Sequence, residues 1–188
     1  MDFQHIPNDL PIPIDDGGSD HLPSLHIPSV ILRSTDGSDI RLDDFSRNEK
    51  VVVYCYPMTG RPGIPLPDGW DAIPGARGCT PQSCSFRDHN ADLVRLGVRV
   101  FGLSTQSTEY QQEAVNRLHL PFNLLSDEGL LFTKALMLPT FEVEGRVLLK
   151  RLTFIIISGV IEKVFYPVFP PDGNAIEVLG WLAKYGEN

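Results

Sequence analysis

One uninterrupted apolar run constrains the fold more than any other feature of this chain. Residues 51–56, Val-Val-Val-Tyr-Cys-Tyr, are β-branched or aromatic apart from one cysteine and do not alternate with polar residues. This pattern is typical of a strand that is buried on both faces of its sheet. We therefore expect a sheet that is covered by helices on both sides, which is the arrangement of an α/β protein.

The rest of the chain predicts the order of the other elements. Strands are expected at 30–32, 40–42, 98–104, 121–125, 141–143, 147–151, 152–157 and 161–166. Helices are expected at 43–47, 80–96, 108–118, 127–137 and 174–185. The helix at 80–96 has an apolar stripe of Phe86, Leu93 and Leu96. The expected N-terminal caps of the other helices are Asp43 or Asp44, Thr108, Asp127 and Asn174. Strand, helix and strand in succession form parallel units, whereas the Glu144-Gly145 and Ser158-Gly159 turns predict hairpins. The expected fold class is α/β, with a mixed central sheet flanked by helices, and it is compatible with a thioredoxin-like fold.

The length and composition suit one globular domain, since the chain has 188 residues and is 42% hydrophobic. Residues 1–27 are rich in proline, aspartate and glycine without periodicity, which predicts an extended or partly disordered arm before a domain at 28–188. Residues 58–76 contain too many prolines and glycines for a helix or a central strand. We expect an inserted loop there, which is either a flap over the thiol of Cys79, to which it leads, or a surface insertion without a role.

The charge and the cysteine content limit the possible partners and compartments. The net charge is −8 and the basic residues are scattered, which disfavours binding to nucleic acid or to an anionic membrane. No apolar run approaches membrane-spanning length and residues 1–22 do not resemble a signal peptide, so we expect a cytoplasmic protein. In a reducing compartment, three cysteines are more often catalytic or inert than bonded as structural disulfides.

Cys79 stands where the helix predicted at 80–96 begins. Gly78 and Pro81 bracket it, and proline is tolerated only in the first turn of a helix. The free N–H groups and the positive end of the helix dipole favour a thiolate there, and Arg77 acts in the same direction. Cys79 is therefore the candidate reactive thiol.

Cys84 follows five residues later in the same predicted helix. Five helical residues rise about 7.5 Å and turn about 500°, so a bond between the two sulfurs would require the first turns of the helix to unwind. We interpret the pair as a redox switch, although the residues alone also allow two inert cysteines on a buried helix. Cys55 lies inside the apolar run at 51–56, where a thiol is expected to be buried and unreactive.

Five segments of the chain resemble the peroxiredoxins, and in particular their Q-type branch, the bacterioferritin comigratory proteins. They are Tyr56-Pro57, Gly78-Cys79-Thr80 with Cys84-Ser85-Phe86-Arg87-Asp88, Val100-Phe101-Gly102-Leu103-Ser104, Leu124-Leu125-Ser126-Asp127 and Arg151-Leu152-Thr153-Phe154. They occur in the family's order, and the resemblance as a whole covers residues 28–182. The resemblance implies a thioredoxin-like fold and a thiol-dependent peroxidase that reduces hydrogen peroxide and alkyl hydroperoxides.

The resemblance also implies a role for each site residue. Cys79 would be the peroxidatic cysteine, Cys84 the resolving cysteine, and Arg151 the cation that holds the thiolate and polarises the peroxide. On position alone, Arg151 is equally an exposed cation at a strand edge beside Lys150. A dithiol such as thioredoxin would reduce the enzyme, no metal or organic cofactor is implied, and a monomer or weak dimer is expected.

The chain departs from the family just before Cys79. Where the family usually has a proline and a threonine or serine, this chain has Ala72 and Ala76. The hydroxyl that would contact the thiolate and the peroxide is therefore missing from its usual place. We predict that Thr59, just after Pro57, supplies this hydroxyl, with Thr80 as the second candidate.

Three other functions remain as alternatives. A thioredoxin-fold thiol-disulfide oxidoreductase normally uses a C-x-x-C motif, which this chain lacks. A structural zinc site could be assembled from Cys79, Cys84, His89 and His119, but their spacing is not typical of zinc ligands. A non-catalytic redox-sensing or binding module is favoured only by the alanine at position 76.

Overall fold

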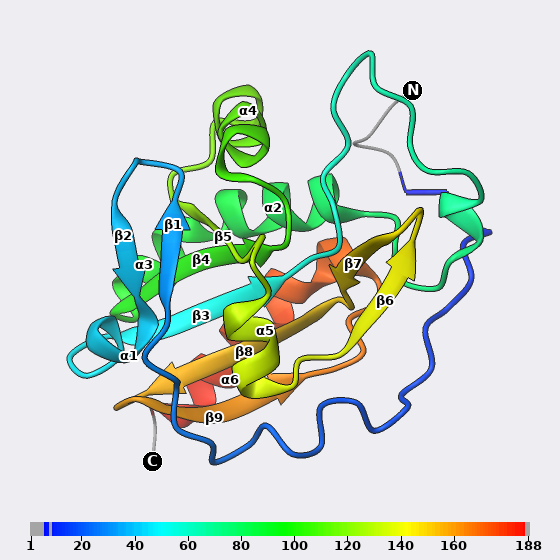
Figure 1. Ribbon diagram of the computed structural model, residues 1–188. Helices are drawn as coiled ribbons and strands as arrows, with labels where there is room; N and C mark the ends of the chain where they lie inside the picture. The colour runs from blue at the N-terminus through cyan, green and yellow to red at the C-terminus, as the bar shows by residue number, and fades with distance from the viewer. Residues whose placement is uncertain (1–5, 8, 187–188) are drawn as a thin grey trace.

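The computed structural model describes residues 6–7 and 9–186. The centre of the fold is a mixed seven-stranded sheet with the strand order β2-β1-β5-β4-β3-β8-β9 (Figure 1). These strands are β1 (Ile31–Ser34), β2 (Asp39–Arg41), β3 (Lys50–Cys55), β4 (Val98–Ser104), β5 (Leu124–Ser126), β8 (Leu152–Ile157) and β9 (Val160–Phe165). β3, β4 and β5 are parallel, and the other neighbouring pairs are antiparallel. The predicted α/β class with a mixed central sheet is confirmed.

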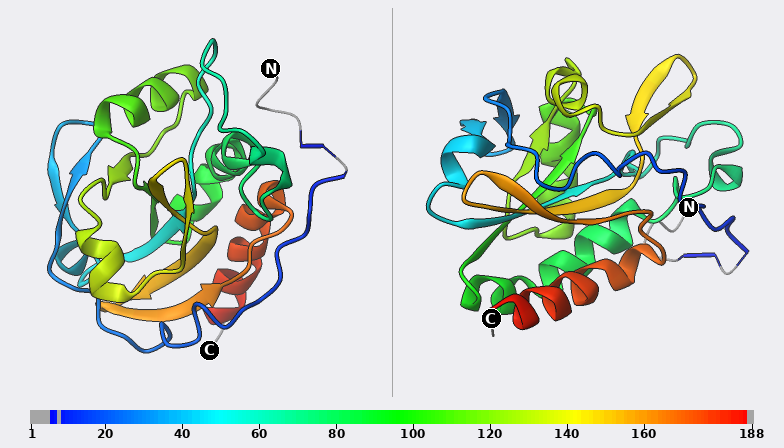
Figure 2. Two further views of the ribbon diagram at one scale, coloured as in Figure 1. Left: turned by 45° about the vertical axis from the view of Figure 1, so that its right-hand side comes forward. Right: turned by 90° about the horizontal axis from the view of Figure 1, so that it is seen from below.

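Helices cover both faces of this sheet. They are α1 (Leu42–Phe45), α2 (Cys79–Asp88), α3 (Asn90–Arg95), α4 (Thr108–Leu118), α5 (Leu131–Leu136) and α6 (Asn174–Tyr185), with short 3-10 turns η1 (Trp70–Ala72) and η2 (Pro171–Gly173). Figure 2 shows α2 and α6 side by side on one face, with α5 and the hairpin of β6 (Thr140–Val143) and β7 (Arg146–Leu149) on the other.

The apolar run at 51–56 supplies the centre of the molecule. β3 lies between β4 and β8, and its residues alternate between two core clusters. Val52 and Tyr54 pack with side chains of α2, α3, α4 and α6, whereas Val51, Val53 and Cys55 pack with side chains of α5 and of the N-terminal arm. Both faces of the strand are therefore buried, as the absence of alternating polar residues predicts.

The helix predicted at 80–96 is in fact two helices, because the chain is interrupted at His89. A ring nitrogen of His89 hydrogen-bonds the carbonyl of Ser85 at 2.9 Å, and its own carbonyl accepts the first bonds of α3. Of the predicted apolar stripe, Phe86 and Leu93 are buried, but Leu96 is 37% exposed because it lies beyond the end of α3.

Three of the predicted helix caps are wrong. α1 begins directly after Arg41 without a side-chain cap, so Asp43 and Asp44 lie in its first turn. Ser107 caps α4 in place of its neighbour Thr108, by accepting a hydrogen bond from the N–H of Tyr110. Asn174 is the first residue of α6, and its side chain is bonded within the core.

α5 begins later than expected and its N-cap residue is Leu130, so Asp127 acts on the start of this helix from three residues before the cap position. The Asp127 carboxylate accepts hydrogen bonds from the N–H groups of Phe132 at 3.0 Å and Thr133 at 2.7 Å. A carboxylate at this end of a helix satisfies free N–H groups and complements the helix dipole.

The described part of the N-terminal arm, predicted to be extended or partly disordered, is packed against the domain (Figure 1). Leu22 and Ile27 are buried in the core cluster around Val53, and Asp16 accepts hydrogen bonds from Lys150 at 2.5 Å and from Tyr166 at 2.6 Å. Residues 1–5 and 8 of the predicted arm lie outside the described residues. No helix among those described is long and apolar enough to cross a membrane.

Candidate active site

Cys79 is the first residue of α2, as the positions of Gly78 and Pro81 predict. Gly78 has a φ of 102°, in the region that side chains rarely adopt, and a Cβ atom there would lie 2.3 Å from Cγ of Pro171. A glycine is therefore required for the chain to enter the helix against η2. The Cys79 side chain is 3% exposed, and its Sγ lies 3.5 Å from the carbonyl oxygen of Ala76.

Arg151, which directly precedes β8, lies against this sulfur. Its Nη2 is 3.2 Å from Cys79 Sγ and also donates to the carbonyls of Gly75, Ala76 and Arg77 at 3.1–3.2 Å. Because the side chain is 3% exposed, the alternative of an exposed cation at a strand edge is wrong. A guanidinium held by several backbone acceptors presents a fixed positive charge to the sulfur.

Gln82 holds the other end of the guanidinium. Its side-chain oxygen accepts a hydrogen bond from Nη1 of Arg151, and its Nε2 donates to Asn174 Oδ1 at 3.0 Å. That oxygen also accepts from the hydroxyl of Thr153 at 2.6 Å. Gln82 and Asn174 were not predicted as residues of the site. The position of Gln82, three residues after Cys79, was a usable signal, because residues three apart share a helix face.

The two candidate hydroxyls are in different situations. The Thr59 hydroxyl donates to Gln106 Oε1 at 3.1 Å, and the backbone of Thr59 exchanges two further hydrogen bonds with the same side chain. In contrast, the buried Thr80 hydroxyl has no hydrogen-bond partner among the residues that the structure describes. Thr80 also lines the small cavity at Cys79, whereas Thr59 does not.

The cavity at Cys79 has a volume of about 10 Å³. It is lined by Met58, Gly60, Leu66, Trp70, Arg77, Gly78, Cys79 and Thr80. A cavity of this volume holds roughly one water molecule. The segment predicted as an inserted loop thus contributes side chains directly over the thiol.

Cys84 and Cys55 differ from Cys79 in their surroundings. Cys84 lies in the middle of α2, is half-buried, and has a pKa raised chiefly by burial, while the nearby Arg87 lowers it. Cys55 is fully buried, as predicted, and burial raises the pKa of its thiol well above the usual value. All three cysteines are free thiols in this structure.

Comparison with known proteins identifies the family. Residues 22–179 match the family model described as Redoxin. Peroxiredoxin Q, chloroplastic, of Sedum lineare is 31% identical over 156 residues, which cover 82% of this chain and 74% of that protein. Peroxiredoxin Bcp of Escherichia coli is 31% identical over 167 residues, covering 84% and 93% of the two chains. This chain is a peroxiredoxin of the Q branch.

Solved structures share the fold of this peroxiredoxin. Peroxidoxin BcpB from Mycobacterium tuberculosis superposes with a TM-score of 0.72 at 22% identity, covering 87% of this chain and 98% of that one. A mutant of PrxQ from Xylella fastidiosa also gives a TM-score of 0.72, at 20% identity and with 88% and 98% coverage. The predicted thioredoxin-like fold is confirmed, and as a peroxiredoxin the chain is an oxidoreductase of the thiol-dependent peroxidase class.

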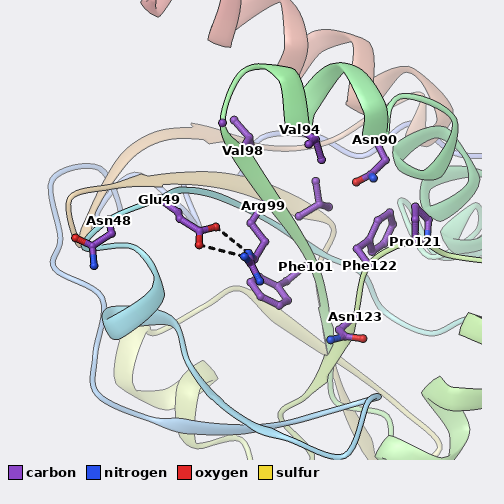
Figure 3. Close-up of a pocket in the computed structure, with 12 residues that line it drawn as sticks. Asn48, Glu49, Asn90, Val94, Val98, Arg99, Phe101, Pro121, Phe122 and Asn123 are labelled. Atoms are coloured by element: carbon purple, nitrogen blue, oxygen red, sulfur yellow. Dashed lines mark hydrogen bonds and ion pairs between the residues drawn. The ribbon is translucent and has the colours of Figure 1, made fainter.

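A much larger cavity in this peroxiredoxin lies away from the reactive thiol. It has a volume of about 560 Å³ at the beginning of β4, and Figure 3 shows Glu49 and Arg99 paired within it. Two hydrogen bonds of 2.8 and 3.1 Å join these side chains. No cysteine lines this cavity, so its size does not make it the site of thiol chemistry.

The zinc alternative finds no support in the described residues. Within 6–7 and 9–186, no group of three or more histidine, cysteine, aspartate or glutamate side chains is placed to hold a metal ion. One proposed ligand, His89, uses a ring nitrogen to bond the Ser85 carbonyl.

Proposed function

We propose that this peroxiredoxin reduces hydrogen peroxide and alkyl hydroperoxides, with Cys79 as the peroxidatic and Cys84 as the resolving cysteine. The observation that carries the proposal is the 3.2 Å contact between Arg151 Nη2 and Cys79 Sγ at the start of α2. Here a buried thiol meets a fixed cation and the positive end of a helix dipole. Both would stabilise the negative charge that passes through the sulfur and the leaving oxygen during the attack on the peroxide.

In the first step, the Cys79 thiolate attacks the terminal oxygen of the peroxide. The O–O bond breaks, its electron pair stays on the leaving oxygen, and that oxygen takes up a proton and departs as water or an alcohol. Cys79 is oxidised to a sulfenic acid. Arg151 is already in place where negative charge moves from sulfur to oxygen, so little reorganisation is needed during the reaction.

In the second step, the Cys84 thiolate attacks the sulfur of the sulfenic acid. The S–O bond breaks, hydroxide takes up a proton and leaves as water, and a disulfide joins Cys79 to Cys84. Because both residues lie in α2, the first turns of this helix must unwind before the sulfurs can meet. Unwinding also removes Cys84 from the surroundings that raise its pKa.

A dithiol of the thioredoxin type then reduces the disulfide by two successive exchange reactions. We expect this peroxiredoxin to act as a monomer or weak dimer. A cytoplasmic location remains our prediction, and the plant relatives are named as chloroplastic proteins.

The contacts favour Thr80 over our first candidate, Thr59, as the hydroxyl that contacts the peroxide. Thr59 already donates to Gln106, whereas the buried Thr80 hydroxyl lacks a partner and borders the cavity at Cys79. A buried hydroxyl without a partner is costly, and a peroxide oxygen would satisfy it.

Paired substitutions test this assignment. We expect Thr80→Val to lower kcat/KM for hydrogen peroxide by about 10- to 100-fold, as for the loss of one hydrogen bond to a charged group. Thr59→Val should leave kcat/KM within about twofold of wild type, since its hydroxyl serves Gln106. Cys79→Ser should abolish turnover in the same assay. An unchanged rate in Thr80→Val together with a loss in Thr59→Val would reverse the assignment.

A further inference from the structure

The inserted segment 58–76 builds the wall in front of Cys79. Four side chains or backbone positions of this segment line the cavity at the sulfur: Met58, Gly60, Leu66 and Trp70. Trp70 is 3% exposed and belongs to a separate apolar cluster with Met58, Ala76 and Leu148. Its ring also lies against Phe141 of β6, with 6.2 Å between ring centroids. The wall is therefore a packed part of the molecule.

Polar contacts fix the same wall along its length. At one end, the Gly60 carbonyl accepts a hydrogen bond from Nη2 of Arg117 in α4 at 2.8 Å. In the middle, the N–H of Asp68 donates to a carboxylate oxygen of Glu144 in the β6–β7 turn at 3.2 Å. Near Trp70, the Asp71 carboxylate pairs with Arg77 at 3.2 Å. Figure 1 shows the segment passing close to the β6–β7 hairpin.

The space left by this wall sets a limit on substrate size. The cavity of about 10 Å³ has room for roughly one water molecule, so hydrogen peroxide needs only small side-chain shifts to enter. An aryl or branched alkyl hydroperoxide adds several carbon atoms beside the reacting oxygens. Where those atoms extend toward segment 58–76, they would have to displace Trp70 and break its packing with Met58 and Phe141.

We propose that Trp70 is a specificity-determining residue that makes this peroxiredoxin favour hydrogen peroxide over bulky organic hydroperoxides. The inference rests on the proposed function of Cys79. Segment 58–76 thus selects substrates by the size of the peroxide's organic group.

The test compares kcat/KM for hydrogen peroxide and cumene hydroperoxide in wild type, Trp70→Ala and Trp181→Ala. Wild type should prefer hydrogen peroxide, and Trp70→Ala should raise the ratio of cumene hydroperoxide to hydrogen peroxide by about tenfold or more, the range for altered pocket contacts. Trp181→Ala is the matched control, because Trp181 stacks on Tyr185 in α6 and does not line the cavity. Its ratio should equal that of wild type.

Two outcomes would overturn the inference: equal kcat/KM for both peroxides in wild type, or an unchanged ratio in Trp70→Ala that retains a wild-type melting curve. If Trp70→Ala does not fold, Trp70→Leu and Leu66→Ala replace smaller parts of the same cavity lining. Both should also raise the ratio of kcat/KM for cumene hydroperoxide to that for hydrogen peroxide. An unchanged ratio in both would overturn the inference equally. A wild-type protein that reduces neither peroxide contradicts the proposed function itself, which separates the two failures.

Discussion

At the scale of single residues, Cys79, Cys84 and Cys55 carry the same thiol in three different environments. Cys79 has a guanidinium 3.2 Å from its sulfur, Cys84 is half-buried within a helix, and Cys55 is fully buried in β3. The sequence predicts the burial of Cys55 and the helix start at Cys79, because both depend on neighbouring residues. Without the family resemblance, the sequence could not predict that Arg151 contacts Ala76 and Cys79, because these residues lie more than 70 positions away from it in the chain.

The thiol that Cys84 presents once α2 has unwound predicts a pH-dependent second step, because the surroundings that raise its pKa are then lost. The pKa of the Cys84 thiol is raised above its usual value of 9.0 in the helical state. This thiol therefore stabilises the helical state of α2 over the unwound state at pH values below 9.0, and the stabilisation is lost at higher pH. We expect the rate of disulfide formation to rise by about tenfold per pH unit between pH 6 and 8, following the thiolate fraction. Stopped-flow tryptophan fluorescence of the sulfenic-acid form measures it. A rate independent of pH in this range would contradict the prediction.

At the scale of elements, α2 must be stable in the reduced enzyme and yet be able to unwind. Its first turns are held by Gly78 against Pro171, by Gln82 bonded to Asn174, and by the Ser85 hydroxyl, which donates to the Asp172 carbonyl at 2.6 Å. Most of these contacts are to η2 and the start of α6. The sequence predicts the start of α2 but not these contacts, because nothing in the local pattern relates position 78 to position 171.

Gly78→Ala tests how tightly the start of α2 is held. We expect it to lower the free energy of unfolding by about 1–3 kcal/mol, because alanine is strained at a φ of 102° and its Cβ would collide with Pro171. Gly180→Ala is the control, since Gly180 lies within α6 with open space around it, and alanine there should raise stability by about 0.5–1 kcal/mol. Urea denaturation measures both. Equal effects of the two substitutions would show that position 78 is not specially constrained.

At the scale of the whole molecule, the fold joins a conventional sheet to two segments whose packing partners the sequence did not predict. Apolar runs and glycine turns predict the strands and hairpins, since both depend on local periodicity and backbone preference. The same criteria identify 58–76 as a flap or a surface insertion and the N-terminal arm as extended or partly disordered, without the residues that each contacts. Where such segments pack depends on contacts with distant residues, such as those of Trp70 with Phe141 and of Leu22 with the core.

Leu22 tests whether the arm is part of the stable domain. It is fully buried in the core, so Leu22→Ala should lower the free energy of unfolding by about 2–5 kcal/mol. Leu25 lies three residues further on and is 36% exposed, so Leu25→Ala should cost clearly less, about 1 kcal/mol or below. The measurement is urea denaturation of both variants. Similar small losses would mean that the arm is not integrated into the domain.

The most direct test of the account is peptide mapping by mass spectrometry after treatment with about one equivalent of hydrogen peroxide, the stoichiometry of one thiolate attack. Wild type should lose two hydrogens and give a disulfide-linked peptide that joins Cys79 to Cys84. Cys84→Ser should instead give a sulfenic acid on Cys79 that dimedone traps. If Cys79 remains a free thiol in both proteins, or if the link forms through Cys55, the assignment of the peroxidatic and resolving cysteines is contradicted.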